Sequence, residues 1–380
     1  MEWLGVLRAL TILSLALLMA CAPRGQITLE PSAAAVGQVQ RIFVGTTRAP
    51  MPDGSFGSGR SENLSLARFD ISVPPNRGLG EINWPPRHGR RDAQTQFLTV
   101  DERVYPAEAG FRADLKRQLD LTGGDAVIFV HGFNNNFAEG LYRLAQLSHD
   151  LKLSGTFVHY AWPSAADPLG YEFDRDSAMF ARDGLERLIR EVERAGAKRI
   201  LLVAHSMGAE LTMETLQQIA IRGGKRTLDR IGGVILISPD IDVDVFRSQA
   251  HAIGHLPQPF VIFGSNRDRY LRLSAAVTGT PDRLGSVSDV TSLADLDVTV
   301  LDVGNFSAGA GHFVFGDSAA LIGLFDSLPE FEAALNAPRG FQNTQDPGPT
   351  APNQKAKRVV LPGPTVECKD TLWRLVPLGC

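Results

Sequence analysis

One serine in this sequence stands where a nucleophile would be expected. Ser206 lies at the centre of Ala204-His205-Ser206-Met207-Gly208, immediately after an apolar run that predicts a buried strand. The pattern is typical of a tight strand-to-helix turn that exposes a serine hydroxyl at the end of a sheet, with alanine in place of the first glycine. A serine at this point can also cap the following helix. The local pattern alone leaves both interpretations open.

A serine nucleophile needs a base that takes its proton and an acid that orients the base. His312 follows the last predicted strand within a glycine-rich loop, and we expect it to be the base. Asp268 and Asp240 each follow a predicted strand, so both are candidates for the acid. With either of them the chain order is serine, aspartate, histidine, which is found in one class of serine hydrolases, and the strand positions favour Asp268.

Acyl transfer through a serine also needs N–H donors for the oxyanion. Met207 follows the nucleophile, and the segment 131–133 follows the apolar run 126–130. We therefore expect the backbone N–H groups of Met207 and Phe133 to form the oxyanion hole, with His131 orienting the loop backbone. The mouth of the site could be lined by Phe133, Phe137, Trp162, Tyr171 and Met207, and each of them could equally be an ordinary core or surface residue.

Continuous apolar runs alternate with amphipathic patterns along the chain. The expected strands are 41–47, 67–73, 97–100, 126–130, 156–162, 199–205, 233–238, 260–265 and 297–303. Helical spacing of leucines follows 126–130 and 156–162. This alternation predicts an α/β fold with a mostly parallel central sheet, helices on both faces and an N-terminal antiparallel strand region. Since ligands collect at the carboxyl ends of parallel strands, the candidate residues should meet at one edge of the sheet.

Bulk properties and rival motifs point to no other chemistry. The chain has 380 residues and a net charge of −4 without a long basic run, so we expect no nucleic-acid partner. His251 and His255 have the spacing of zinc ligands on a helix, but Ala252 stands where a metalloprotease carries glutamate. We expect neither a metal nor a cofactor.

Eight segments together resemble a family of bacterial α/β-hydrolase-fold proteins of unknown function. They are "RIFVGTTRAP", "FVHGFNNNF", "YAWPS", "VAHSMG", "SPDIDVDVF", "SNRDRYLRLS", "DRLG" and "GHFVF", and they span 41–315. The resemblance implies the α/β-hydrolase fold and hydrolase activity without an established substrate. It also implies that Ser206, Asp268 and His312 form a triad.

The N-terminus predicts export. Residues 1–20 contain an uncharged run of twelve residues, 9–20, which is the length of a signal-peptide core and too short to span a bilayer. The run ends in Leu18-Met19-Ala20-Cys21, which resembles a lipobox with Cys21 as the lipidated residue. We expect an outer-membrane lipoprotein that faces the periplasm; a plain cleaved signal or an uncleaved anchor are the alternatives.

The predicted organisation places one folded domain between low-complexity segments. The expected parts are a signal peptide (1–20), a linker after the lipobox cysteine (21–37), the α/β-hydrolase domain (38–337), a proline-rich disordered linker (338–365) and a tail (366–380). The tail holds Cys368 and Cys380, which either form a disulfide or remain free thiols.

Three functions are compatible with these observations. A serine esterase or lipase-like enzyme that hydrolyses small or lipid-like acyl esters through an acyl-enzyme fits the motifs best. An acyltransferase could use the same triad, and a non-catalytic envelope protein could keep the fold for binding or scaffolding. The sequence does not determine the oligomeric state.

Overall fold

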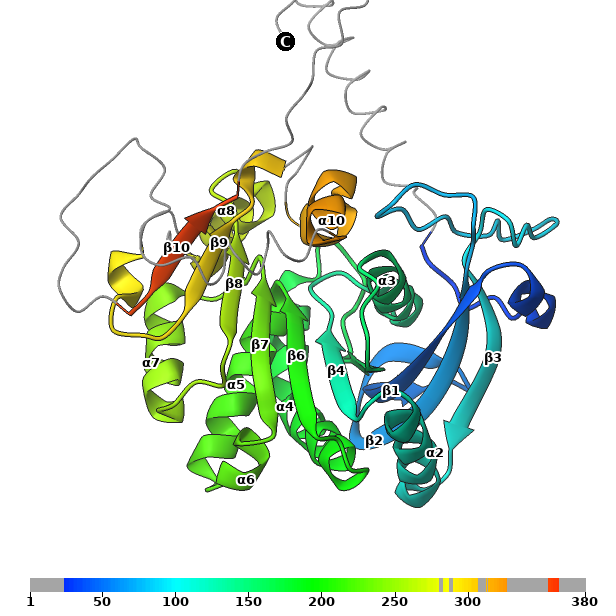
Figure 1. Cartoon of the computed structure of the whole chain (residues 1–380), viewed down its shortest axis with the longest axis horizontal. Helices are drawn as coiled ribbons and strands as arrows, with labels where there is room; N and C mark the ends of the chain where they lie inside the picture. The colour runs from blue at the N-terminus through cyan, green and yellow to red at the C-terminus, as the bar shows by residue number, and fades with distance from the viewer. Residues whose placement is uncertain are drawn as a thin grey trace, which may run out of the picture.

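The computed structural model describes residues 24–279, 283–286, 290–306, 312, 314–326 and 355–361. Within them, one sheet of ten strands has the order β10-β9-β8-β7-β6-β4-β5-β1-β2-β3 (Figure 1). The strands are β1 (Gln38–Pro50), β2 (Phe56–Val73), β3 (Leu98–Tyr105), β4 (Asp125–Val130), β5 (Thr156–Ala161), β6 (Arg199–His205), β7 (Ile231–Ile237), β8 (Phe260–Gly264), β9 (Thr299–Asp302) and β10 (Lys357–Val360).

The sheet is mixed in the way the sequence predicts. Neighbouring strands from β10 across to β1 are parallel, whereas β1–β2 and β2–β3 are antiparallel. The predicted fold class, a mostly parallel α/β sheet with an N-terminal antiparallel region, is therefore confirmed. The parallel strands end together at the upper edge in Figure 1, so the turns that follow them share one side of the molecule.

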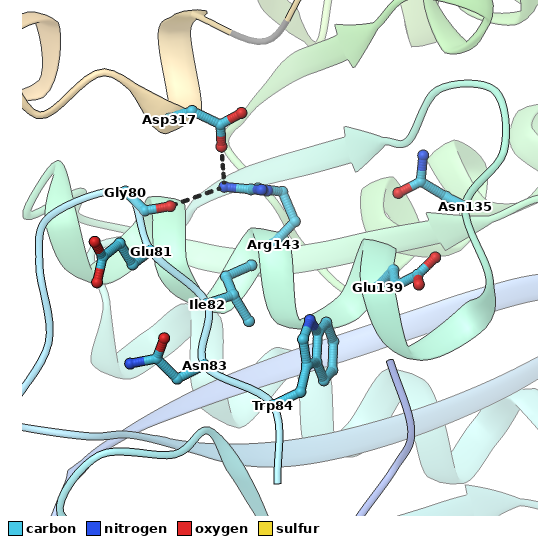
Figure 2. A pocket seen from close by; sticks show the side chains of 9 residues that line it. All are labelled: Gly80, Glu81, Ile82, Asn83, Trp84, Asn135, Glu139, Arg143 and Asp317. Carbon is cyan, nitrogen blue, oxygen red and sulfur yellow. Dashed lines mark hydrogen bonds and ion pairs between the residues drawn. The ribbon is translucent and has the colours of Figure 1, made fainter. Parts of the chain in front are cut away.

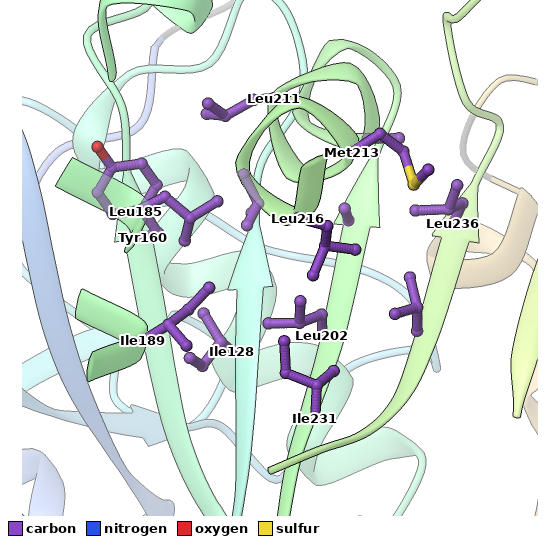
Figure 3. Packing of buried hydrophobic residues seen from close by; sticks show 14 of the residues in the cluster. Ile128, Tyr160, Leu185, Ile189, Leu202, Leu211, Met213, Leu216, Ile231 and Leu236 are labelled. Carbon is purple, nitrogen blue, oxygen red and sulfur yellow. The ribbon is translucent and has the colours of Figure 1, made fainter. Parts of the chain in front are cut away.

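Helices cover both faces of the sheet. The helices are α2 (Glu108–Leu121), α3 (Phe137–Asp150), α4 (Tyr171–Arg194), α5 (Met207–Ile221), α6 (Lys225–Leu228), α7 (Val243–Ile253), α8 (Arg269–Thr278), α9 (Val314–Asp317) and α10 (Ala319–Asp326). One buried cluster joins the strands to α2, α4, α5 and α7, and a second joins the opposite face to α3 and α10. Figure 3 shows Ile128, Leu202 and Leu236 of the central strands in the first cluster.

Alternation along the strands explains the two clusters. In β4, Ile128 belongs to the first cluster, while its neighbours Val127 and Phe129 belong to the second. Successive side chains of a strand point to opposite faces, so an apolar run without alternation buries both faces at once. This is why the continuous runs of the sequence predicted helices on both sides.

The terminal segments differ from the expected linkers. Residues 24–37 lie against the domain: Glu30 N donates to Thr99 O at 2.8 Å, and Arg24 pairs with Glu139 at 2.6 Å. Within the segment 338–365, which was expected to be disordered, 357–360 forms β10 and pairs in parallel with β9. Composition missed this strand because an open sheet edge supplies backbone partners to a short segment whatever its flanking prolines.

The remaining predictions for the termini lie outside the described residues. They concern the signal peptide 1–20, Cys21, and the pair Cys368 and Cys380 in the tail 366–380. In the part of the chain that the structure describes, no helix is long and apolar enough to cross a membrane.

Candidate active site

Ser206 occupies a strained turn between β6 and α5. Its backbone has φ 53° and ψ −123°, a conformation that residues with a Cβ rarely adopt. Gly208 allows the turn, because a Cβ there would lie 2.7 Å from the carbonyl oxygen of Val130 and closer still to that of His131. The Ser206 side chain makes no capping hydrogen bond to α5. Although Ser206 is buried, the geometry of the turn therefore favours a nucleophile over a helix cap.

His312 lies between Ser206 and Asp268. Its Nε2 is 3.0 Å from Ser206 Oγ, and its Nδ1 is 2.8 Å from Asp268 Oδ2. A carboxylate accepts hydrogen bonds, so Nδ1 carries the proton and Nε2 is left to accept one from the serine hydroxyl. The three residues come from the ends of β6 and β8 and from the segment after β9, which lie at the same edge of the sheet.

Asp268 is held by the helix that follows it. It is the N-cap of α8, and its Oδ1 accepts hydrogen bonds from Tyr270 N at 2.9 Å and Leu271 N at 3.1 Å. The side chain is completely buried. The N-terminal N–H groups and dipole of α8 stabilise the negative charge, which leaves the second oxygen fixed toward His312.

Asp240, the alternative acid, is engaged elsewhere. Its carboxylate accepts hydrogen bonds from Ser274 Oγ at 2.7 and 2.8 Å and from Tyr171 OH at 3.0 Å, and it lies 3.4 Å from Arg283 Nε. Its backbone N–H donates to Ser206 O at 3.3 Å. Asp240 thus supports the serine turn through its backbone. The geometry favours Asp268 as the partner of the histidine.

The loop after β4 lies against the serine turn. A Cβ on Gly132 would lie 2.9 Å from Ser206 Cβ, so only glycine allows this approach. Among the described residues, neither the Phe133 N–H nor the Met207 N–H donates a hydrogen bond. Two unsatisfied donors on adjoining turns are what an oxyanion hole requires.

His131 fixes the start of this loop through Trp162. The two rings stack with centroids 4.8 Å apart, and Trp162 Nε1 donates to His131 O at 2.7 Å. His131 Nε2 lies 3.1 Å from Trp162 O in return. Burial keeps the pKa of His131 well below its usual range, so the ring is neutral and acts as a structural element.

A buried arginine holds the rest of the loop. Arg48 on β1 donates to Asn135 O at 2.7 Å and to Ser164 O at 3.0 Å. Asp174 on α4 accepts from Asn134 N at 3.0 Å and from Ser164 Oγ at 2.6 Å. Burial lowers the pKa of Arg48 to about 10, which leaves it charged at neutral pH, and the carboxylate of Asp174 opposes that shift.

Sequence reasoning missed this clamp, although its residues lie in or beside segments that it had singled out. Arg48 lies within the segment "RIFVGTTRAP" and Ser164 ends "YAWPS". Neither residue belongs to a motif or a periodic pattern in the sequence. The clamp forms only in the folded protein, where strands β1 and β5 lie beside the loop after β4. The charged residue inside an otherwise apolar segment was the one signal that could have indicated Arg48.

Of the five residues that could line the mouth of the site, three take the alternative role of core residues. Trp162 and Met207 are fully buried and Phe137 is 6% exposed, so these three are core residues. Phe133 and Tyr171 are half-buried, with ring centroids 5.6 Å apart. Tyr270 on α8, which the sequence did not indicate, has its ring centroid 5.2 Å from that of His312. Large aromatics beside a motif are buried as often as they line a site, and only tertiary contacts separate the two cases.

The two histidines with zinc-like spacing are not on one helix. α7 ends at Ile253 and Gly254 caps it, so His255 lies beyond the helix that carries His251. His251 Nε2 instead pairs with Asp295 at 2.7 Å. In the described residues no cluster of three or more histidine, cysteine, aspartate or glutamate side chains could hold a metal ion.

The sheet and the strained serine turn at its carboxyl edge define an α/β hydrolase by fold. The chain belongs to the family described as alpha/beta hydrolase of unknown function (DUF900), whose model matches residues 107–324. No curated protein matches the chain.

Three solved structures are similar to the chain at low identity. Esterase B from Lactobacillus rhamnosis is 13% identical over 88% of this chain and 98% of its own, with a TM-score of 0.36. A hyperthermophilic esterase from Pyrobaculum calidifontis is 12% identical over 79% of this chain and 85% of its own, with a TM-score of 0.35. Lipase B from Aspergillus fumigatus is 13% identical, with a TM-score of 0.29, and the match covers 38% of this chain and 37% of the lipase.

Proposed function

We propose that the protein is a serine hydrolase that cleaves carboxylic esters, with Ser206 as nucleophile, His312 as base and Asp268 as orienting acid. The observation that carries this proposal is the chain of contacts from Ser206 Oγ through His312 to Asp268, at 3.0 and 2.8 Å. Membership of an α/β-hydrolase family supports it independently of the geometry.

In the proposed reaction, Ser206 Oγ attacks the ester carbonyl carbon while His312 Nε2 takes the hydroxyl proton. The N–H groups of Met207 and Phe133 hold the oxyanion. The carbon–oxygen bond to the alcohol then breaks, and His312 returns the proton to the leaving oxygen. Water, deprotonated by His312, attacks the acyl-serine. The bond between the acyl carbon and Ser206 Oγ then breaks, His312 returns the proton to Oγ, and the carboxylic acid leaves.

The exposed face of α8 supports an acyl ester as substrate. Tyr270, Leu273 and Val277 are 53%, 62% and 57% exposed, and their spacing places them on one face of the helix. Tyr270 contacts His312, so this apolar face begins at the reacting groups. An acyl chain laid along it would remove apolar surface from water.

Covalent labelling tests the proposal directly. A fluorophosphonate should modify Ser206 in the wild type, with the labelled peptide identified by mass spectrometry, and His312→Ala should abolish the labelling. Labelling should be matched by hydrolysis of p-nitrophenyl acetate. A folded wild-type protein that neither reacts nor hydrolyses would favour the binding or scaffolding role, and transfer of the acetyl group to an added alcohol in preference to water would favour the acyltransferase.

We further propose that the chain is exported and anchored to the outer membrane through Cys21. The support is the twelve-residue uncharged run that ends next to this cysteine. Lipid chains on the cysteine would give stable anchoring, which a single chain does not. A tethered enzyme would meet lipid-like esters at the membrane surface.

A further inference from the structure

A cavity of about 560 Å³ lies between the segment 80–84, α3 and the loop after β4, which carries a proposed oxyanion donor (Figure 2). Its volume falls within the range of small-molecule sites. The segment 80–84 forms one wall and α3 forms another, with the loop after β4 and the end of α9 completing it. The lining residues are Gly80, Glu81, Ile82, Asn83, Trp84, Asn135, Glu139, Arg143 and Asp317.

Two walls of the cavity are formed by residues that are close along the chain to the proposed reacting groups. Asn135 is two residues after Phe133, whose N–H is a proposed oxyanion donor, and Arg48 holds its carbonyl. Asp317 follows His312 by five residues along the chain. Asn135 Nδ2 donates to Phe133 O at 2.8 Å and to Gly132 O at 3.3 Å, so this wall contacts the loop that carries the proposed donor.

The charges in the cavity are mostly compensated by the protein itself. Arg143 pairs with Asp317 at 2.8 Å and donates to Gly80 O at 3.3 Å, as Figure 2 shows. Glu139 accepts from Arg24 and from the backbone N–H groups of Gly25 and Asn136. Of the carboxylates in the cavity, only Glu81 lacks a positively charged partner among the described residues.

Neutral polar groups remain for a ligand. Within the described part of the chain, the Asn83 amide and the Trp84 indole N–H make no hydrogen bond, and neither does Asn135 Oδ1. Trp84 is stacked on Tyr142 with centroids 5.0 Å apart, which fixes the plane of its ring. Amide and indole groups offer both donors and acceptors together with a flat apolar surface.

We propose that this cavity binds a hydroxyl-rich, sugar-like part of the ester substrate. The assignment rests on the proposed hydrolase function and adds the chemical class of the alcohol part of the ester. Hydroxyl groups would satisfy the free amide and indole groups, while the carbon–hydrogen face of a ring would pack on Trp84. An anionic group would face the carboxylate of Glu81, and a long alkyl chain would leave the polar lining unsatisfied.

Substrate preference tests the proposal. With the full-length protein, kcat/KM for an acetylated methyl glucopyranoside should exceed that for hexyl acetate by about tenfold or more, the worth of one or two hydrogen bonds. Hydrolysis of p-nitrophenyl acetate serves as the measure of the basal activity. Equal kcat/KM values for the sugar and alkyl acetates, in an enzyme active on p-nitrophenyl acetate, would overturn the assignment and leave the hydrolase function intact.

Two variants locate the preference in the cavity. Asn83→Ala should lower the ratio of the two kcat/KM values about tenfold. Asn76→Ala, a matched change in the same loop that removes an exposed asparagine outside the cavity, should leave the ratio unchanged. An unchanged ratio in Asn83→Ala would contradict the role of the cavity.

A binding measurement separates this proposal from catalysis. Saturation-transfer NMR with methyl glucopyranoside and the full-length Ser206→Ala variant should show contact to the sugar ring, reduced in Asn83→Ala. If p-nitrophenyl acetate is not hydrolysed at all, the hydrolase function fails, and this measurement still decides the cavity: sugar contact supports a carbohydrate-binding site and its absence overturns it.

Discussion

At the residue scale, Asp268 serves two partners at once. One oxygen caps α8 and the other meets His312, so the helix that begins beside the site also fixes the acid. Asp240 binds Ser274 and Tyr171 instead, which leaves it no oxygen directed at the histidine. Substitution of the two aspartates should therefore affect activity differently, although both residues follow strands at the same edge of the sheet.

Replacing each aspartate by asparagine separates their roles. Asp268→Asn should lower kcat for p-nitrophenyl acetate about a thousandfold or more, because an amide stabilises the wrong tautomer of His312. Asp240→Asn should retain most of the activity. Circular dichroism and the melting temperature of both variants provide the control, and the reverse order of activities would identify Asp240 as the acid.

Arg48 should affect kcat indirectly, because it holds the loop after β4. Arg48→Lys replaces a fork that reaches several carbonyl groups by a single ammonium, so the Phe133 N–H should lose its alignment. We expect kcat to fall about tenfold to a hundredfold with little change in KM, less than the cost of losing an oxyanion donor outright. Arg60→Lys, on the neighbouring strand, is the control; a change in KM alone would contradict a positioning role.

At the element scale, the serine turn depends on how closely β6 and α5 approach the end of β4. Gly208→Ala places a methyl group against two backbone carbonyls that cannot move independently. We expect a loss of about 1–3 kcal/mol in the free energy of unfolding, or no folded protein. Gly323→Ala in α10, where a Cβ would meet nothing within 4 Å, should be neutral or stabilising. Urea denaturation of both variants gives the comparison, and equal stability would show that the turn can relax.

At the scale of the whole molecule, buried histidines make the stability depend on pH. Burial lowers the pKa of His159 to about 3 and keeps the pKa of His131 and His205 well below the usual value. The unfolded chain takes up protons on these residues below about pH 6.5, and the native protein does not. Their stabilisation is therefore complete above that pH and decreases as the pH falls.

This effect should appear as a loss of unfolding free energy of up to about 1.4 kcal/mol per pH unit for each histidine. Burial raises the pKa of Glu210 to about 7, which acts in the opposite direction between about pH 4.5 and 7. Urea midpoints from pH 8 to pH 4.5 measure the sum. His159→Gln should reduce the slope, and a slope that is unchanged would show that His159 is not kept neutral by the fold.

The proposed anchoring through Cys21 also concerns the whole chain. When the protein is expressed in a Gram-negative bacterium fed with an alkyne fatty acid, the wild type should incorporate the label and enter the membrane fraction. Cys21→Ser should lose both the label and the membrane association, because the acyl chains need this thiol. A labelled Cys21→Ser protein would refute lipidation at Cys21, and an unlabelled but exported wild type would indicate a plain cleaved signal.

The sequence by itself determined the mostly parallel sheet with its antiparallel N-terminal strands, and it placed Ser206, His312 and two candidate aspartates at one edge of that sheet. Each of these has a local signature: apolar runs that bury both faces of a strand, and turns such as 204–208 in which steric demands restrict the residue types. Only the tertiary structure distinguished the contacts of Asp268 from those of Asp240 and showed that Trp162 is buried. The Arg48 clamp and the polar cavity likewise exist only in three dimensions. These features join segments that are far apart in the chain, and a contact between such segments leaves no periodicity or spacing in either of them.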